Sequence, residues 1–227
     1  MFVILISYRA RGNQEFRRRQ LMTAIDNFKT YFKQNKIEYK IVISEQNNDN
    51  KFNRGFLLNA AFLEAEKEIK TITAKKYVHM NADYTFDLSR PFPQELLDFK
   101  EGIIDLYRIT LPVLGGACVF DAKTYKTFNG FPNDLEGWGS DDWAIYNRIV
   151  HNNIHIMTPD GLFNSGFIME ERARFDDDYY ITNEKNMVLA SRCDFETNGL
   201  TTIKYKVDGY GEFNDDNVII HYLINNE

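Results

Sequence analysis

Residues 128–143, FNGFPNDLEGWGSDDW, form the most distinctive stretch of the sequence. The first half is rich in glycine, proline, asparagine and aspartate, which favour turns, so we expect a loop there. Gly137 and Gly139 flank Trp138 and give the backbone around this indole unusual conformational freedom. An indole face can cover the apolar side of a sugar ring, so a mobile tryptophan suits a carbohydrate site.

Two adjacent carboxylates, Asp141 and Asp142, follow this loop at the start of a predicted helix. Ser140 is a candidate N-cap, and acidic residues in a first helical turn are stabilised by the helix dipole. The pair therefore has a structural interpretation, stabilisation of a helix start. It also has a functional one, because a carboxylate can accept the proton of a hydroxyl group. The helix itself is predicted from apolar residues at helical spacing, namely Ala144, Ile145, Ile149 and Val150.

The composition indicates a folded protein with an ordinary core. The chain has 227 residues, of which 44% are hydrophobic. No linker or repeat interrupts it, so we expect a single domain over residues 1–227.

The net charge of -6 argues against broad nucleic-acid binding. Cys118 and Cys193 make no disulfide framework, and the apolar residues 1–8 are too short for a transmembrane segment. We therefore expect a soluble, cytoplasmic protein.

The first predicted strand, residues 2–6, is a continuous apolar run rich in β-branched residues, as in buried parallel strands. Residues 7–13 follow as a loop. In an open α/β sheet, ligands bind at the carboxyl edge of the strands, where this loop would lie. Arg9 and Arg11 would place two cations there, which suits a phosphate group; the alternative is two ordinary surface arginines.

A second strand, residues 39–44, leads through a polar loop to Phe52 and Arg54. These two residues precede a helix predicted over residues 57–65. Phe52 is positioned to stack on a nucleobase and Arg54 to contact phosphate. The structural alternative, a hydrophobic staple and a surface charge at a helix start, explains them equally well.

A third strand, residues 77–80, runs into Asp83. An acid directly after a central strand is well placed to bind a divalent metal through oxygen, although aspartate is also a common turn residue. His79 lies within the strand and is expected in the core. Residues 114–120 form a further predicted strand, entered through Gly115 and Gly116, which allow either close approach of a ligand or a β-bulge.

The remaining pattern completes an α/β fold. Strands alternate with helices through the first half, which predicts a Rossmann-like, mostly parallel central sheet flanked by helices. A small antiparallel addition is expected near the C-terminus, with a hairpin through residues 208–211. The other expected strands cover residues 103–110, 154–156, 201–207 and 218–224, the other helices cover residues 121–128 and 186–192, and residues 159–175 are expected to be loop.

Taken together, several of these stretches resemble the β-1,4-galactosyltransferases of animals and their microbial relatives. The resemblance rests on Phe52-Asn53-Arg54 with Leu57-Leu58-Asn59, on Gly115-Gly116, and on Asn129-Gly130-Phe131-Pro132-Asn133 leading to Gly137-Trp138-Gly139 and the two aspartates. It implies a GT-A fold, a UDP-sugar donor, usually UDP-galactose, the cofactor Mn²⁺, and inverting transfer to a sugar hydroxyl. The membrane anchor, stem and disulfides of the animal enzymes have no counterpart, which fits a microbial or viral cytoplasmic enzyme.

The resemblance also implies roles for individual residues. Asp142 matches the catalytic base, and Trp138, Gly139, Asp141 and Asp142 match acceptor-binding positions. The metal would be held by Asp83 and Glu171, with Glu170 as an alternative. The matched nucleotide-sugar positions are Ser7, Tyr8, Arg9, Arg11, Phe52, Arg54, Ala82, Asp83, Gly115, Gly116 and Trp138.

The chain departs from the family pattern at several positions. Asn81 replaces the first acid of the family's Asp-x-Asp motif, and Glu171 stands near the place of a metal-binding histidine. An oxygen ligand there remains compatible with Mn²⁺. Trp143 replaces a third acid. Val113 replaces an aromatic residue of the galactose-specific animal enzymes, which would leave room for the N-acetyl group of UDP-N-acetylgalactosamine.

The expected function is therefore transfer of a hexose or N-acetylhexosamine to an oligosaccharide, glycolipid or other glycan. We expect a role in capsule, lipopolysaccharide or other surface glycan synthesis, beside a membrane-bound assembly system. Three alternatives remain: a retaining glycosyltransferase of the same fold, a nucleotidyltransferase, and a degenerate sugar- or nucleotide-binding protein without activity. A nucleotidyltransferase usually has a glycine-rich basic loop after its first strand, and residues 7–13 contain only one glycine.

Overall fold

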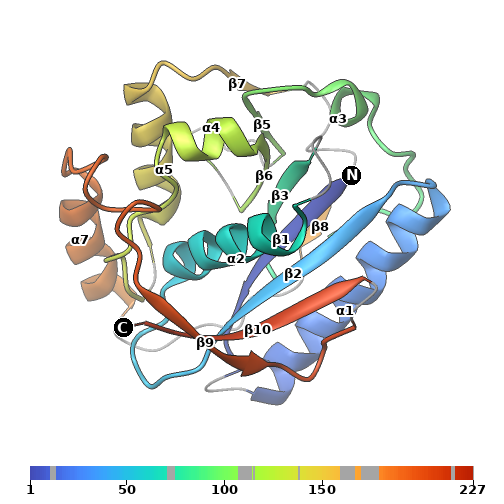
Figure 1. Cartoon of the computed structure of the whole chain (residues 1–227), viewed down its shortest axis with the longest axis horizontal. Helices are drawn as coiled ribbons and strands as arrows, with labels where there is room; N and C mark the ends of the chain where they lie inside the picture. The colour runs from blue at the N-terminus through green and yellow to red at the C-terminus, as the bar shows by residue number, and fades with distance from the viewer. Residues whose placement is uncertain are drawn as a thin grey trace.

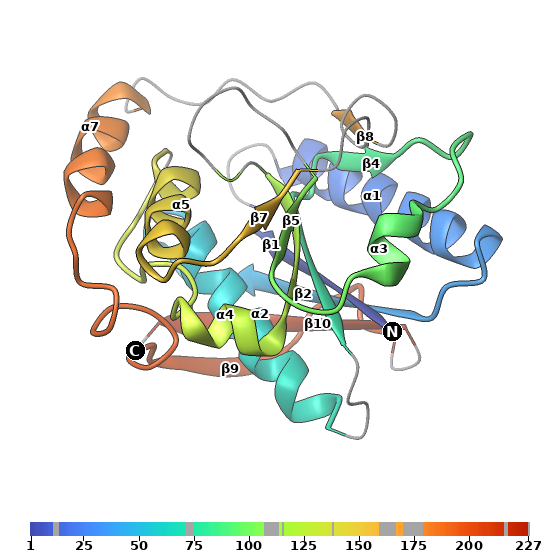
Figure 2. The ribbon, with the colours of Figure 1, turned by 90° about the horizontal axis from the view of Figure 1, so that it is seen from above.

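The computed structural model describes residues 1–10, 14–70, 75–106, 114, 116–137, 139–158, 167–169, 179–215 and 218–226. Helices pack on both faces of a central sheet (Figures 1 and 2). In chain order the elements are β1 (Phe2–Tyr8), α1 (Gln14–Gln34), β2 (Tyr39–Gln46), α2 (Arg54–Glu68), β3 (Lys76–Met80), β4 (Tyr84–Phe86), α3 (Gln94–Asp98), β5 (Ile103–Asp105), β6 (Ala117–Asp121), α4 (Ala122–Thr127), α5 (Asp141–His151), β7 (Ile156–Met157), β8 (Phe167–Met169), α7 (Tyr179–Ala190), β9 (Tyr205–Tyr210) and β10 (Ile219–Asn226).

Within the described residues, the central sheet has eight strands in the order β7-β5-β6-β3-β1-β2-β10-β9. The adjacent strands β3, β1, β2 and β10 run parallel to one another, and β5 is parallel to β7. The mostly parallel sheet is therefore confirmed. Two antiparallel additions interrupt it: β6 pairs antiparallel with β3 and β5, and β9 pairs antiparallel with β10. The antiparallel addition at the C-terminal end was predicted, whereas the reversed strand β6 in the middle was not.

The two faces of the sheet are buried by different helices. Alternate residues of β1 point to opposite faces. Ile4 and Ile6 pack with α1 and β4, while Val3 and Leu5 pack with α2, α4 and α5. Figure 2 shows α1 and α2 on opposite sides of the sheet. One face of α1 is apolar and buried against the sheet, because Leu21, Ile25, Phe28 and Phe32 are each at most 4% exposed.

Three predictions about local structure were wrong. Residues 208–210 continue strand β9 rather than forming the hairpin turn, so the turn comes later. Residues 167–169 form strand β8, which pairs with β4 in a separate two-stranded sheet, within a stretch expected to be loop. Ser7 and Tyr8 are the last residues of β1 and not part of the following loop. Each error concerns a short element or an end that is decided by pairing with a distant strand.

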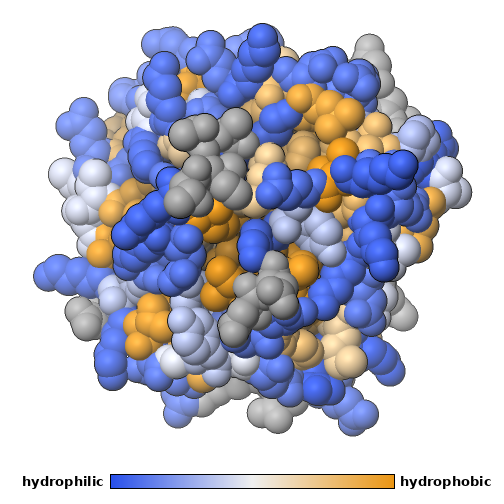
Figure 3. Space-filling model, turned by 45° about the vertical axis from the view of Figure 1, so that its right-hand side comes forward, coloured by the Kyte–Doolittle hydropathy of each residue, from blue (hydrophilic) through white to orange (hydrophobic). Residues whose placement is uncertain are grey.

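The face in Figure 3 is mostly hydrophilic, with hydrophobic residues visible chiefly near its centre. No helix in the described ranges is long and apolar enough to cross a membrane. Both cysteines are free thiols, with Cys118 buried and Cys193 exposed. The exposed large hydrophobic residues are spread over separate elements, namely Met22, Leu88, Leu97, Val150, Met187, Val188 and Tyr210.

Candidate active site

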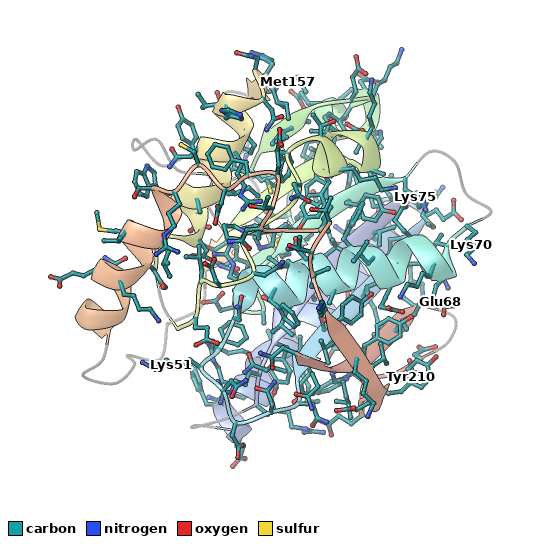
Figure 4. All side chains as sticks on the ribbon, turned by 60° about the vertical axis from the view of Figure 1, so that its left-hand side comes forward. Lys51, Glu68, Lys70, Lys75, Met157 and Tyr210 are labelled. Carbon is teal, nitrogen blue, oxygen red and sulfur yellow. The ribbon has the colours of Figure 1, made fainter. Side chains whose placement is uncertain are left out.

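The candidate site is built where helices α2 and α5 begin. Asn53 caps α2, because its side-chain oxygen accepts a hydrogen bond of 2.9 Å from the backbone N–H of Phe56. Arg54 is the first residue of the helix. Figure 4 locates this end of α2 near Lys51, whereas Glu68 and Lys70 mark the opposite end.

Arg54 joins the two helix starts through a pair of carboxylates. Its Nη1 contacts Oδ2 of Asp141 and lies 2.8 Å from Oδ1 of Asp142. The Arg54 side chain is 14% exposed, against 16% for Asp141 and 33% for Asp142. Burial acts to lower the pKa of Arg54, but the two aspartates outweigh it and hold the pKa above its ordinary value. The guanidinium is therefore a permanent cation between two acids.

His79 of β3 is a further member of this cluster. Its Nε2 lies 3.2 Å from Nη2 of Arg54, and it accepts a hydrogen bond from that group in the neutral tautomer with the proton on Nδ1. Burial first, and the positive charge of Arg54 second, lower the pKa of His79 well below its ordinary value, so the ring is neutral. Phe131 packs on both residues: its ring lies 5.5 Å from the His79 ring and 5.9 Å from the guanidinium carbon of Arg54. The prediction that His79 belongs to the core is confirmed.

The end of β3 and the entry to β6 meet beside this cluster. Met80 pairs with Ala117, so Gly116 stands next to Asn81. A Cβ atom on Gly116 would collide with the Asn81 side chain and would lie 2.6 Å from the Tyr84 hydroxyl. The backbone N–H of Leu114 donates a 3.2 Å hydrogen bond to the carbonyl of Asp142. Segments around residues 81, 114–116 and 142 are thus brought together.

The other predicted donor-binding residues that the structure describes lie at the ends of β1 and β3 or directly before α2. Arg9 is half-buried directly after β1, and Ala82 packs against the core. Asp83 is 8% exposed. Phe52 packs against the core on the α2 side, and its carbonyl accepts a 2.6 Å hydrogen bond from the N–H of Gly137. Arg11, Gly115, Trp138, Glu170 and Glu171 lie outside the described residues, and so does Val113.

Burial of Tyr8 raises the pKa of its hydroxyl to about 12, with further contributions from Glu45 and Glu212. Its side chain is 4% exposed, and within the described residues the hydroxyl has no hydrogen-bond partner. Nε of Arg54 is likewise buried and without a partner in that part of the chain. Both are therefore buried donors whose hydrogen-bonding capacity is unused within the described residues.

The start of α5 differs in detail from the prediction. Asp141 and Asp142 are in the first turn as expected, and Ser140 holds the N-cap position. Its side chain does not cap the helix but donates a 3.0 Å hydrogen bond to Asn183 of α7. Val150 was expected on the buried face and is 52% exposed.

Arg148 takes a buried place on α5 that sequence reasoning missed. It is 1% exposed, and its Nη1 donates to the carbonyls of Asn129 and Gly130 at 3.3 Å and 3.1 Å. Burial lowers its pKa to about 10. The signal was available, because Arg148 falls at helical spacing between Ile145 and Ile149. Its role is to hold the loop that precedes the site.

Asn59 of α2 fixes the next part of that loop. Its side chain is fully buried, donates to the Phe131 carbonyl at 2.8 Å and accepts from the Phe131 N–H at 3.0 Å. It also donates to Asn133 and accepts from Tyr125. The conspicuous residues 129–133 therefore serve first to build the loop, and Phe131 is thereby placed against Arg54 and His79.

Comparison with known proteins places this arrangement in a family. A family model described as the N-terminal region of glycosyl transferase group 7 matches residues 1–73. A second, described as the N-terminal domain of galactosyltransferase, matches residues 107–172, so together they cover more than half of the chain. The chain belongs to the β-1,4-galactosyltransferase-like family. The predicted family is confirmed.

Individual relatives of the family are distant in sequence. Mouse β-1,4-galactosyltransferase 7 is 25% identical over 212 residues, which is 90% of this chain and 61% of the mouse protein. Human β-1,4-galactosyltransferase 1 is 30% identical over 133 residues, which is 56% of this chain and 32% of the human protein. The chain therefore spans between about a third and three fifths of the curated relatives that it matches.

Solved structures support the family at the level of fold. The catalytic domain of Drosophila β-1,4-galactosyltransferase 7 in complex with xylobiose superposes with a TM-score of 0.69 at 18% identity, covering 100% of this chain and 94% of that one. A mutant of the same enzyme, in complex with manganese, UDP-Gal and xylobiose, gives 0.69 at 17% identity with the same coverage. The predicted GT-A fold is thus confirmed.

Proposed function

We propose that this protein is a glycosyltransferase that moves a hexose or N-acetylhexosamine from a UDP-sugar to a hydroxyl of a glycan, with inversion at the anomeric carbon. Galactose and N-acetylgalactosamine are the favoured donor sugars. The observation that carries the proposal is the cluster of Arg54, Asp141 and Asp142 at the carboxyl edge of the sheet, in a chain of this family. The cluster supplies a cation for the donor and carboxylates for the acceptor in one place.

Donor binding would use the ends of β1 and β3 together with the start of α2. Arg54 stands at a helix N-terminus, where its charge and the helix dipole would attract a diphosphate, against the opposing charge of Asp141 and Asp142. Its Nε–H has no partner within the described residues and would donate to that group once the side chain turns toward it. Phe52 would stack on the uracil, and Ser7, Tyr8, Arg9 and Gly116 would line the rest, with Arg11, Gly115 and Trp138 completing the set.

Transfer would be a single displacement. The acceptor oxygen forms a bond to the anomeric carbon as the bond from that carbon to the diphosphate oxygen breaks. The acceptor proton passes to Asp142, whose side chain is a third exposed and so can meet a hydroxyl. Asp141 would hold the acceptor, and Arg54 would stabilise negative charge on the leaving UDP. This arrangement favours inversion, because one displacement exchanges the two faces of the carbon.

A divalent metal fits the chemistry of the predicted residues. A related Drosophila structure contains manganese with UDP-Gal. The described ranges hold no group of three His, Cys, Asp or Glu side chains suited to a metal ion. One or two carboxylates with substrate phosphates are, however, a common way to bind such an ion. Asp83 and Glu171, or Glu170, would hold Mn²⁺, which when bound offsets the charge of the diphosphate.

A second candidate is a sugar-nucleotide-binding protein without transferase activity. It is favoured by Asn81, which stands where the family has the first acid of its Asp-x-Asp motif. A retaining transferase is a third possibility. The biological setting that we propose is synthesis of a capsule, lipopolysaccharide or other surface glycan by a cytoplasmic enzyme beside a membrane-bound assembly system.

The test combines binding with product analysis. Thermal shift with UDP-galactose, UDP-N-acetylgalactosamine and UDP-glucose, each with and without Mn²⁺, identifies the donor. An acceptor panel then reports transfer, and NMR of the product reports its anomeric configuration. The proposal predicts Mn²⁺-dependent stabilisation by one donor and an inverted product. Binding without transfer to any acceptor would favour the second candidate, and a retained configuration the third.

A further inference from the structure

Helix α7 lies alongside α5 and the loop before it (Figures 1 and 2). The two helices share a small apolar cluster made by Leu135, Ala144, Ala190 and the partly buried Trp143 and Leu189. Both family models end before α7, whose residues are 179–190.

Two asparagines of α7, three residues apart, bind the loop from one side. Asn186 is 1% exposed, and its Nδ2 donates hydrogen bonds of 3.1 Å to the carbonyls of both Glu136 and Gly139. These two carbonyls lie on either side of residues 137 and 138. Asn183 accepts the 3.0 Å hydrogen bond from Ser140, the residue directly before Asp141. One face of α7 therefore fixes the loop at three points.

The approach between α7 and the loop is close enough to require glycine. Gly139 has φ of 98°, which few side chains tolerate. A Cβ atom there would collide with Oδ1 of Asn183 and lie 2.9 Å from its Cγ. Ser140 also has a positive φ, 66°, although it is not a glycine. The hydrogen bond to Asn183 holds it in this less favourable conformation.

We propose that Asn186, assisted by Asn183, is a positioning residue that sets the loop around residue 138 and the first turn of α5, and hence the direction of the Asp142 carboxylate. This inference rests on the proposed function. The amide suits the task, because its two N–H groups can serve two carbonyls at once. An aspartate of the same size would place a carboxylate against both carbonyls and would donate nothing.

The experiment compares Asn186→Asp and Asn186→Ala with the matched variant Asn152→Asp. Asn152 sits at the other end of α5, where its Nδ2 donates a 2.8 Å hydrogen bond to the Arg148 carbonyl. Hydrogen exchange over residues 134–146 gives a readout that needs no activity. That segment includes the N–H groups of Gly137 and Ala144, which are bonded to Phe52 and Ser140. Both Asn186 variants should exchange faster there, and Asn152→Asp should match the wild type except at residues 148–153.

Kinetics provide the second readout. If the loop is misplaced by about 1 Å, kcat for transfer should fall roughly 10²-fold, while KM for the UDP-sugar stays unchanged. Unchanged exchange over residues 134–146 in both Asn186 variants would overturn the inference, even if no donor were ever found. Faster exchange with wild-type kcat would overturn the positioning role alone. If the Asn186 variants fail to fold, Asn183→Ala, which removes only the bond to Ser140, is tested by the same two readouts with the same criteria.

Discussion

Arg54 and Asp142 stand at the starts of two different helices, and Nη1 of the arginine lies 2.8 Å from Oδ1 of the aspartate. The proposed base is thus tied to the cation that is proposed to bind the diphosphate. Both groups are largely buried, and Asp141 shares the same Nη1. This ion-pair cluster is as much a structural element as a functional one, because it joins α2 to α5 across 88 residues of chain.

Replacing Arg54 by methionine should destabilise the protein. Removing one partner of a buried ion pair leaves the others unpaired, and the loss should be about 3 kcal/mol, the low end for such changes, because Asp142 is a third exposed. Urea unfolding measures it. The matched control is Arg18→Met, which breaks an exposed arginine pair with Glu212 and should cost less than about 1 kcal/mol. If both variants lost the same free energy of unfolding, the buried Arg54 cluster would stabilise the fold no more than an exposed ion pair does.

Gly116→Ala should weaken both folding and donor binding. The added methyl group would displace Asn81 and Tyr84, on either side of Asp83. Overpacking of this kind costs about 1–3 kcal/mol, and a similar loss in the site would raise the Kd for the UDP-sugar about tenfold. Calorimetric titration gives the Kd and thermal unfolding reports the folded state. An unchanged Kd would separate Gly116 from the donor site.

Much of the sheet was predictable because strong local patterns decide it. Continuous apolar runs indicate the buried strands β1, β2 and β3. Apolar residues at helical spacing indicate the helices α1 and α2. Strand β6 could not be assigned its direction, because antiparallel pairing with β3 is a tertiary choice that leaves no local pattern. The pairing of the short strands β4 and β8 could not be predicted for the same reason.

The candidate site, too, could be predicted from the sequence only in part. Asp141 and Asp142 were found from their place after a glycine-flanked tryptophan, and Asp83 from its place after a strand. Their link to Arg54 was not predictable, since it depends on how two helices far apart in sequence meet. Asn186 gave no signal at all: a single asparagine in a helix shows its importance only when its two carbonyl partners are seen.

Glu66 should make stability depend on acid pH. Burial would raise its pKa, but Lys126, Lys75 and Tyr77 bind it and lower the pKa from 4.5 to about 2. A carboxyl group whose pKa is lower in the folded than in the unfolded protein stabilises the fold at every pH above its unfolded-state pKa. This stabilisation is lost as the pH falls from the unfolded-state pKa to the folded-state pKa. The advantage of wild type over Glu66→Gln should therefore be about 2 kcal/mol at pH 7, after allowing for solvent screening, and vanish between pH 4.5 and about 2.

The check for Glu66 is urea unfolding of both proteins from pH 7 to pH 2. Glu66 lies near Lys75, at the end of α2 remote from Arg54 (Figure 4), so donor binding by Glu66→Gln should equal that of wild type at pH 7. A difference in stability that stayed constant down to pH 2 would mean that the network does not hold the carboxylate ionised.

Chelation should reveal the proposed metal. With excess EDTA, the Kd for the UDP-sugar should rise at least tenfold and recover on addition of Mn²⁺. Asp83→Asn should bind the donor equally weakly with and without Mn²⁺, because it lacks the carboxylate. Glu171→Gln and Glu170→Gln, compared side by side, then decide which glutamate contributes. Mn²⁺-dependent binding that survives Asp83→Asn would remove Asp83 from the metal site.

The most direct test is UDP release by wild type, Asp142→Asn and Asp141→Asn with the best donor and acceptor pair. The account predicts that Asp142→Asn loses about 10²–10⁴-fold in kcat, because the proton acceptor is removed. The Kd for the donor should stay nearly unchanged, because Asp141 still pairs with Arg54. Asp141→Asn should mainly raise KM for the acceptor. Wild-type turnover in Asp142→Asn would contradict the assignment of the base and with it the proposed mechanism.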